Sequence, residues 1–217
     1  MDYAAARHNM VENQIRTNRV TDPLVTDAME ALPRELFVPK QMRGIAYIDE
    51  DLPLGNGRFL MEPMVLARLL QMAEIKPTDV VLEIGCATGY CAGVVSKIAS
   101  TVVALESDDE MSQRANSVLN ELGIHNVAVV NGPLREGYPA QAPYDVIVIS
   151  GAVEEVPPGL CQQLADGGRL VAVVAGPANM GQATLIERVG DAFGRRVFFE
   201  AGTPLLPGME KQQGFVF

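Results

Sequence analysis

The chain has 217 residues, 48% of them hydrophobic, and 27 Asp and Glu against 17 Lys and Arg give a formal net charge of -10. A chain of this length buries enough apolar surface to fold without disulfides or a structural metal. The acid excess excludes broad non-specific nucleic-acid binding, which needs clustered cations. Three cysteines without metal-ligand spacing, no apolar signal segment and no membrane-length apolar run predict a cytoplasmic protein. We expect no metal, nucleic-acid or membrane ligand, and the sequence does not indicate the oligomeric state.

The first 75 residues are expected to form a helical extension. Asp22 is suited to cap a helix whose first residue is Pro23, and Pro33 ends that helix. A stretch rich in Pro and Gly follows at 35–59 and is long enough to suggest a functional loop. The helices predicted in this part span residues 3–17, 22–32 and 62–75.

From residue 76 onward, short apolar runs alternate with helical segments, which is typical of a parallel sheet covered on both faces. The last two strands have no room for a helix between them, so they must pair antiparallel. We predict an α/β fold with a doubly wound, mostly parallel sheet that ends in an antiparallel hairpin, within a single domain spanning 1–217. The predicted strands are 80–85, 101–106, 127–130, 145–150, 169–174, 184–189 and 196–201, and the predicted helices are 88–99, 108–122 and 155–164.

A candidate ligand site follows the first two predicted strands of the sheet. Gly85 and Gly89 flank the turn from strand to helix, where small residues and helix N–H groups admit a ligand. Glu106 ends the next strand and offers two acceptor oxygens to the hydroxyls of a ribose. The dinucleotide fingerprint needs Gly at 87 and usually Gly or Ala at 90. The chain has Ala87 and Tyr90 there, so NAD fits poorly.

An acid just before the glycine turn favours a different ligand. Glu83 stands two residues before Gly85, where a carboxylate can help to hold a cation. This favours S-adenosylmethionine (SAM), which carries an ammonium and a sulfonium and has no pyrophosphate. The alternative is a turn that uses its glycines only for close packing.

The chain resembles the protein-L-isoaspartate O-methyltransferases, a family of class I SAM-dependent methyltransferases. The resemblance covers nearly the whole chain and rests on segments in the family's order and spacing, namely MVENQI, MEALPRELFVP, AYIDEDLPLGNG, VLEIGCATGY, LGIHNVAVVNG, PYDVIVIS and QLADGGRLV. It implies a Rossmann-like methyltransferase fold and SAM as cofactor. It also implies methyl transfer to the carboxylate of isoaspartyl residues, a protein-repair reaction whose partner is a damaged protein or peptide.

The resemblance also implies roles for individual residues. Gly85, Cys86 and Gly89 would line the methionine part of the cofactor, and Glu106 would hold the ribose. The segment 52–55 would border the peptide cleft, with Leu54 and Gly55 as the candidate substrate contacts.

Two positions depart from the family pattern. The family's loop carries a Ser beside the transferring methyl group, and this chain has Met61, which donates no hydrogen bond. At the adenine the family has Gly-Asp, whereas Gly132 and Pro133 lack that acceptor. We expect Met61 mainly to pack, and backbone groups and stacking still to hold the ring. A methyltransferase with another acceptor and a non-catalytic SAM-binding relative are the alternatives that follow.

Arg58 stands where the family usually has Gln. Its planar guanidinium suits a carboxylate, and an acidic enzyme needs a local cation to receive an acidic acceptor. We hypothesise that Arg58 contacts the acceptor. The alternative is a surface arginine paired with Glu62 or nearby acids.

Overall fold

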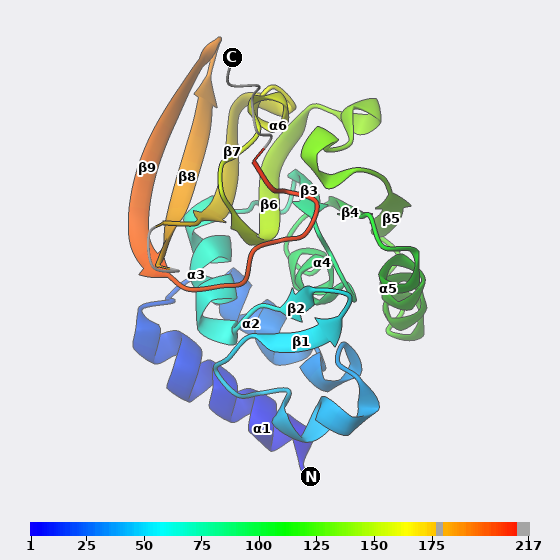
Figure 1. Ribbon diagram of the computed structural model, residues 1–217. Helices are drawn as coiled ribbons and strands as arrows, with labels where there is room; N and C mark the ends of the chain where they lie inside the picture. The colour runs from blue at the N-terminus through cyan, green and yellow to red at the C-terminus, as the bar shows by residue number, and fades with distance from the viewer. Residues whose placement is uncertain (177–179, 212–217) are drawn as a thin grey trace.

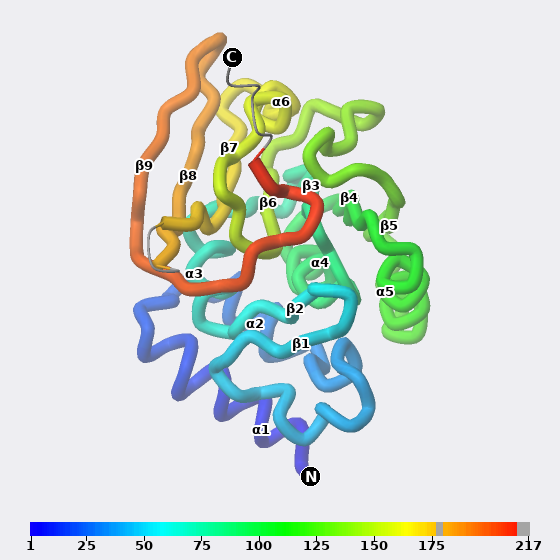
Figure 2. The backbone as a smooth tube through the Cα atoms, viewed as in Figure 1, coloured from blue at the N-terminus to red at the C-terminus, as the bar shows by residue number. Residues whose placement is uncertain are grey.

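The structure is a computed structural model that describes residues 1–176 and 180–211 (Figures 1 and 2). Its centre is a seven-stranded sheet, with spatial order β5 (Val127–Asn131), β4 (Thr101–Glu106), β3 (Val80–Ile84), β6 (Tyr144–Val153), β7 (Leu164–Val174), β8 (Gly181–Val189) and β9 (Ala192–Ala201). The first five of these pair in parallel, and β8 pairs antiparallel with both β7 and β9. The predicted mostly parallel sheet with a terminal antiparallel hairpin is confirmed.

Two apolar layers cover this sheet. One lies between the sheet and most of the helices, and the other contains α6 together with Leu206 and Met209 near the C-terminus. Fully buried strands of this kind read as continuous apolar runs rather than as alternating ones. The helices are α1 (Tyr3–Met10), α2 (Pro23–Ala31), α3 (Pro63–Ala73), α4 (Tyr90–Val95), α5 (Asp109–Glu121) and α6 (Pro158–Cys161).

The N-terminal extension follows its predicted helices closely. Helix α1 continues into a π turn, η1 (Val11–Ile15), and a 3-10 turn, η2 (Arg16–Asn18), so the segment 3–17 is helical but changes its winding. Asp22 caps α2 as predicted, because its side chain accepts a hydrogen bond from the backbone N–H of Leu24 at 2.9 Å.

Two helices of the sheet domain are shorter than predicted. Gly89 is the N-cap of α4 with φ of 89°, so the helix begins after it rather than at residue 88. Helix α6 has only four residues instead of the predicted 155–164. Pro157 and Pro158 set its start, and β7 begins at Leu164, five residues earlier than predicted, which leaves no length for a longer helix.

The predicted functional loop is ordered. It forms two 3-10 segments, η3 (Arg34–Leu36) and η4 (Lys40–Ile45), and a hairpin of β1 (Leu52–Gly55) and β2 (Arg58–Leu60). The hairpin turn is Asn56-Gly57, with φ of 50° and 73°. Two consecutive positive φ angles are what a type I′ turn requires, and Asn-Gly is its preferred pair.

A buried arginine holds this loop against the sheet domain. The Arg34 side chain is fully buried; its Nε donates to the carbonyl of Ala46 and its Nη2 to the carbonyl of Met61, each at 2.7 Å. Its guanidinium carbon lies 4.7 Å from the centre of the Tyr90 ring. Arg34 thereby connects η3, the segment before α3 and the first turn of α4.

We expect Arg34→Met to lower the free energy of unfolding by about 2–4 kcal/mol, because two buried carbonyls lose their donors. Urea unfolding followed by circular dichroism measures the change. Arg16→Met is the control, since Arg16 pairs with Glu12 at an exposed site and its loss costs less than about 1 kcal/mol. Equal stability of the two variants contradicts the structural role of Arg34.

Candidate cofactor and acceptor site

The glycine turn after β3 contains three residues in the left-handed region of backbone conformation. Gly85, Ala87 and Gly89 all have positive φ, at 78°, 47° and 89°. A Cβ atom on Gly89 would lie 3.2 Å from the Cβ of Ala115 in α5, so this glycine also serves close helix packing. The alternative in which the turn uses its glycines for close packing therefore applies to Gly89.

Glu106 ends β4 beside this turn, as predicted, and is completely buried. Its carboxylate accepts hydrogen bonds from three backbone N–H groups, those of Ala87 at 2.8 Å, Ser107 at 2.7 Å and Asp108 at 3.0 Å. These donors hold the carboxylate between the glycine turn and the start of α5. The role of Glu106 toward a ribose stays a prediction.

Arg58 forms a buried ion pair with Glu106, which differs from the alternative of a surface arginine. It is neither a surface residue nor a partner of Glu62, because it is buried with 4% of its side chain exposed and pairs with Glu106. Its Nη2 lies 2.7 Å from Glu106 Oε1, and its Nε lies 3.1 and 3.3 Å from the two carboxylate oxygens. Nη2 also lies 2.9 Å from Ser107 Oγ, and Nη1 donates to the carbonyl of Pro207 at 3.1 Å. In this arrangement the guanidinium is engaged by Glu106, Ser107 and Pro207, and its contact with an acceptor stays a prediction.

A segment near the C-terminus, residues 203–209, crosses the carboxyl ends of β3 and β6 and is called the C-terminal strap here (red in Figures 1 and 2). Its backbone bonds to the end of β6, where Leu206 N–H donates to the carbonyl of Ala152 at 2.8 Å. A Cβ atom on Gly85 would lie 2.7 Å from both δ-methyl carbons of Leu206. The open side of the glycine turn is therefore covered by Leu206.

A cavity of about 20 Å³ remains between the turn, β2 and the end of β6, and it is called the cleft here. Met61 lines it and is buried, as the packing prediction expects. Cys86 and Cys91 also line it, and burial raises the pKa of both thiols, so neither is an ionised nucleophile.

Glu83 is the acid at the floor of this cavity. It is fully buried, and its Oε1 accepts a hydrogen bond from Ser150 Oγ at 2.6 Å, whereas its Oε2 has no partner among the described residues. Burial raises the pKa of Glu83 to about 7, and the nearby charge of Glu106 adds to the increase. Glu83 therefore combines a raised pKa with a place in the lining of this cavity.

The residues in this arrangement do not accommodate SAM. Ligand sites for molecules of this size have volumes of about 300–1,000 Å³, and the cavity here is far smaller. The oxygens of Glu106 already receive bonds from Arg58 and three backbone groups, which leaves no acceptor for ribose hydroxyls.

The remaining predicted positions are not among the residues that line this cavity. Gly132 N–H donates to the carbonyl of Glu106 at 3.0 Å, and Pro133 is exposed just beyond it. Leu54 is buried in β1 and Gly55 is exposed beside it. The roles of these residues toward adenine and peptide stay predictions.

Asp51, an acidic residue that the sequence motifs did not single out, lies beside the C-terminal strap. Asp51 Oδ1 accepts from Glu62 N–H at 3.0 Å and from Thr203 Oγ1 at 3.1 Å. Burial raises the pKa of Asp51, and it raises that of Glu62 to about 7 with help from Asp51 and its neighbours. Asp51 and Thr203 line a cavity of about 650 Å³, together with Glu154. The acid-rich run AYIDED was the available signal in the sequence.

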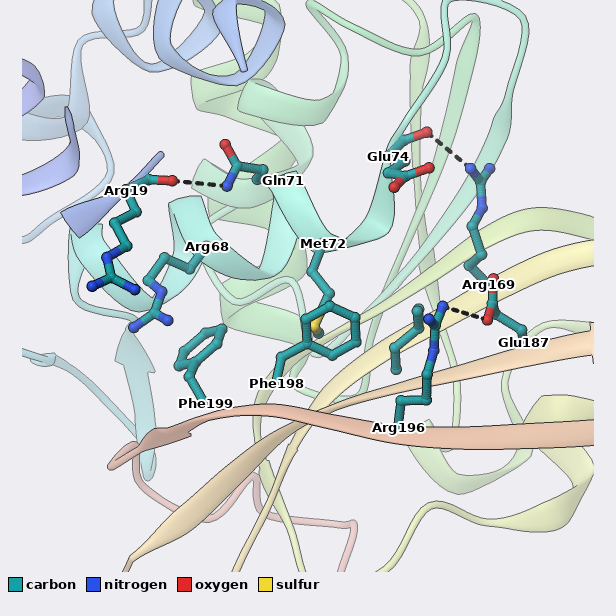
Figure 3. Close-up of a pocket in the computed structure, with 11 residues that line it drawn as sticks. Arg19, Arg68, Gln71, Met72, Glu74, Arg169, Glu187, Arg196, Phe198 and Phe199 are labelled. Carbon is teal, nitrogen blue, oxygen red and sulfur yellow. Dashed lines mark hydrogen bonds and ion pairs between the residues drawn. The ribbon is translucent and has the colours of Figure 1, made fainter. Parts of the chain in front are cut away.

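A separate cavity of about 400 Å³ lies between α3 and the β8–β9 hairpin (Figure 3). Two of its arginines are engaged with neighbouring side chains. The Arg68 guanidinium lies 3.6 Å from the centre of the Phe199 ring, and Arg169 Nη2 lies 2.8 Å from Asp79 Oδ2. No residue that lines this cavity also lines the cleft at Glu83.

The described residues include no group of three His, Cys, Asp or Glu side chains placed to hold a metal ion. Nor does any helix in 1–176 or 180–211 have the length and apolar character needed to cross a membrane.

Comparison with known proteins identifies the family. The family model described as Protein-L-isoaspartate(D-aspartate) O-methyltransferase (PCMT) matches residues 5–196. The chain belongs to this family. The PCMT enzymes are SAM-dependent O-methyltransferases, so the predictions of family, cofactor class and enzyme class are confirmed.

Relatives of known name agree over most of the chain. Protein-L-isoaspartate O-methyltransferase 2 of Shewanella sediminis is 37% identical over 205 residues, which cover 94% of this chain and 83% of that protein. Protein-L-isoaspartate O-methyltransferase of Methanoculleus marisnigri is 40% identical over 184 residues, covering 85% and 84%. The activity predicted for the chain, that of a protein-L-isoaspartate O-methyltransferase, is supported at this level of identity.

Solved structures confirm the fold. A putative protein-L-isoaspartate O-methyltransferase from Plasmodium falciparum, solved in complex with S-adenosyl-L-homocysteine, superposes with a TM-score of 0.80 at 18% identity, covering 93% of this chain and 98% of that one. A second structure named protein-L-isoaspartate O-methyltransferase has the same TM-score at 25% identity, covering 92% and 65%.

Proposed function

We propose that this protein methylates the carboxylate of isoaspartyl residues in damaged proteins or peptides, in the cytoplasm and with SAM as methyl donor. The observation that carries the proposal is the family match over residues 5–196, which includes both the glycine turn and Glu106. The SAM-dependent chemistry belongs to the family, and the isoaspartyl acceptor is what its named relatives indicate.

The acceptor chemistry places modest demands on this chain. A carboxylate is already ionised at pH 7, since its ordinary pKa is about 4, and needs no strong general base. It does need a compensating positive charge, because the cavity beside the strap is lined by Asp51 and Glu154. Arg58 is the cation that the sequence analysis put forward for this role, and in this structure it is paired with Glu106.

A different acceptor is the second candidate function. The observation that favours it is Met61, whose buried side chain lines the cleft where the family has a hydroxyl. Loss of one hydrogen-bond donor at a reacting centre lowers rates by about 10²–10³ without abolishing the chemistry. A low rate by itself therefore does not distinguish a slow isoaspartyl enzyme from an enzyme with another acceptor. The identity of the methylated product distinguishes them.

We expect radiolabelled methyl groups from SAM to be transferred to an isoaspartyl peptide and not to its twin with a normal Asp. Scintillation counting of the two peptides under matched conditions measures the difference. Met61→Ser restores the family's hydroxyl and should raise the rate by about tenfold or more. If both peptides stay unlabelled with wild type and with Met61→Ser, isoaspartyl methylation is not the function.

A further inference from the structure

We propose that Arg58 is an internal ligand of the cofactor site, and that SAM binds only when Arg58 leaves Glu106 and the C-terminal strap moves with it. The proposal rests on the proposed function because it concerns how the same site is opened. It goes beyond that function by assigning to Arg58 control of cofactor binding.

The first argument is competition for the carboxylate of Glu106. In the structure this side chain has no exposed surface, and both oxygens receive hydrogen bonds from Arg58 or from the backbone. A ribose would need those same oxygens. A guanidinium that binds a buried carboxylate through two nitrogens forms one of the stronger side-chain pairs, so the hydroxyls meet a firmly held competitor.

The second argument is that Arg58 also holds the strap. Its Nη1 donates to the carbonyl of Pro207, and the preceding residue, Leu206, covers Gly85. One side chain thus closes both the carboxylate end and the glycine end of the cleft. Release of Arg58 removes the hydrogen bond between β2 and the strap, so the two closures are coupled.

The strap is also held at both of its ends. Thr203 Oγ1 bonds to Asp51 at one end, and Arg135 Nη1 donates to the carbonyl of Met209 at 3.2 Å at the other. These outer contacts do not involve the cleft. They allow the middle of the strap to move away from Gly85 while its ends stay attached.

The expected weakening of SAM binding follows from the populations of two forms. In the closed form Arg58 contacts Glu106 and Leu206 covers Gly85, and in the open form neither contact is present. If 90–99% of molecules are closed, the apparent dissociation constant for SAM rises by about 10–100-fold over that of the open form. A substitution that removes the closed form removes this factor.

Isothermal titration of SAM into wild type, Arg58→Gln, Leu206→Ala and Arg169→Gln tests the proposal. Arg58→Gln introduces the residue usual in the family and keeps a donor for Glu106, and we expect it to bind SAM about 10–100-fold more tightly than wild type. Leu206→Ala should also tighten binding, and it serves if Arg58→Gln folds poorly. Arg169→Gln is the matched control, because it disrupts another buried pair, with Asp79, and Arg169 does not line the cleft; its affinity for SAM should equal that of wild type.

Hydrogen exchange gives a second readout that needs no turnover. In wild type, SAM should speed exchange of the Leu206 amide, which donates to the carbonyl of Ala152 in the closed arrangement. Slower exchange at this amide, or equal SAM affinity in wild type, Arg58→Gln and Leu206→Ala, overturns the proposal. The isoaspartyl proposal is judged separately: tight SAM binding by Arg58→Gln without peptide methylation overturns the proposed function and leaves the role of Arg58 intact.

Discussion

Replacing Glu106 by Gln is expected to lower the free energy of unfolding by about 3–5 kcal/mol. The substitution leaves the guanidinium of Arg58 buried without a counter-charge, and an unpaired buried charge is among the most destabilising changes a protein can receive. It also weakens the acceptor for three backbone N–H groups. Urea unfolding at pH 7, with the Arg169→Gln variant for comparison, measures the loss.

The double variant Arg58→Gln/Glu106→Gln separates the charge effect from the loss of packing. Because it removes both charges together, its stability should recover most of what Glu106→Gln loses, and the four-protein cycle should show a coupling of several kcal/mol. Strictly additive effects of the two substitutions contradict a direct ion pair. Since the pair is buried, the coupling should also change little between low and high salt.

Replacing Glu83 by Gln is expected to stabilise the protein at pH 8 and to have a much smaller effect at pH 5. The pKa of Glu83 is about 7 in the folded protein, against an ordinary value of 4.5. A raised pKa means that the folded state favours the protonated acid. The contribution of Glu83 to stability is therefore fully present below pH 4.5 and is lost as the pH rises through 7.

The difference between these two pKa values corresponds to about 3 kcal/mol, all of which Glu83 loses by pH 8. Thermal unfolding of wild type and Glu83→Gln from pH 5 to pH 8 measures it as a gap that widens with pH. Glu12→Gln, at an exposed site, should show no such widening. A constant gap between wild type and Glu83→Gln means that Glu83 stays ionised throughout. The groups that face it are Ser150, Cys91, Cys86 and Glu106.

Some features missing from the sequence-based prediction had local signals. The Asn56-Gly57 turn is a strong hairpin pattern, and it accounts for the strands within the segment read as a loop. Pro157 and Pro158 likewise indicate that the helix before β7 cannot begin at residue 155. The later start of α4 depends on Gly89, whose positive φ is itself a consequence of the glycine turn.

Local patterns in the sequence were enough to predict the order of strands and helices along the chain, the terminal hairpin and the position of Glu106 at the end of β4, since apolar runs, capping residues and glycine turns act over a few neighbouring residues. The family was predicted from the resemblance of whole segments. The role of Arg58 depends on the folded chain. Its partners Glu106 and Pro207 lie 48 and 149 residues away along the chain, and a charge selects its partner by proximity in space and shared burial. Position alone pointed to the acceptor, whereas the folded chain directs this guanidinium to the acid expected to bind the cofactor.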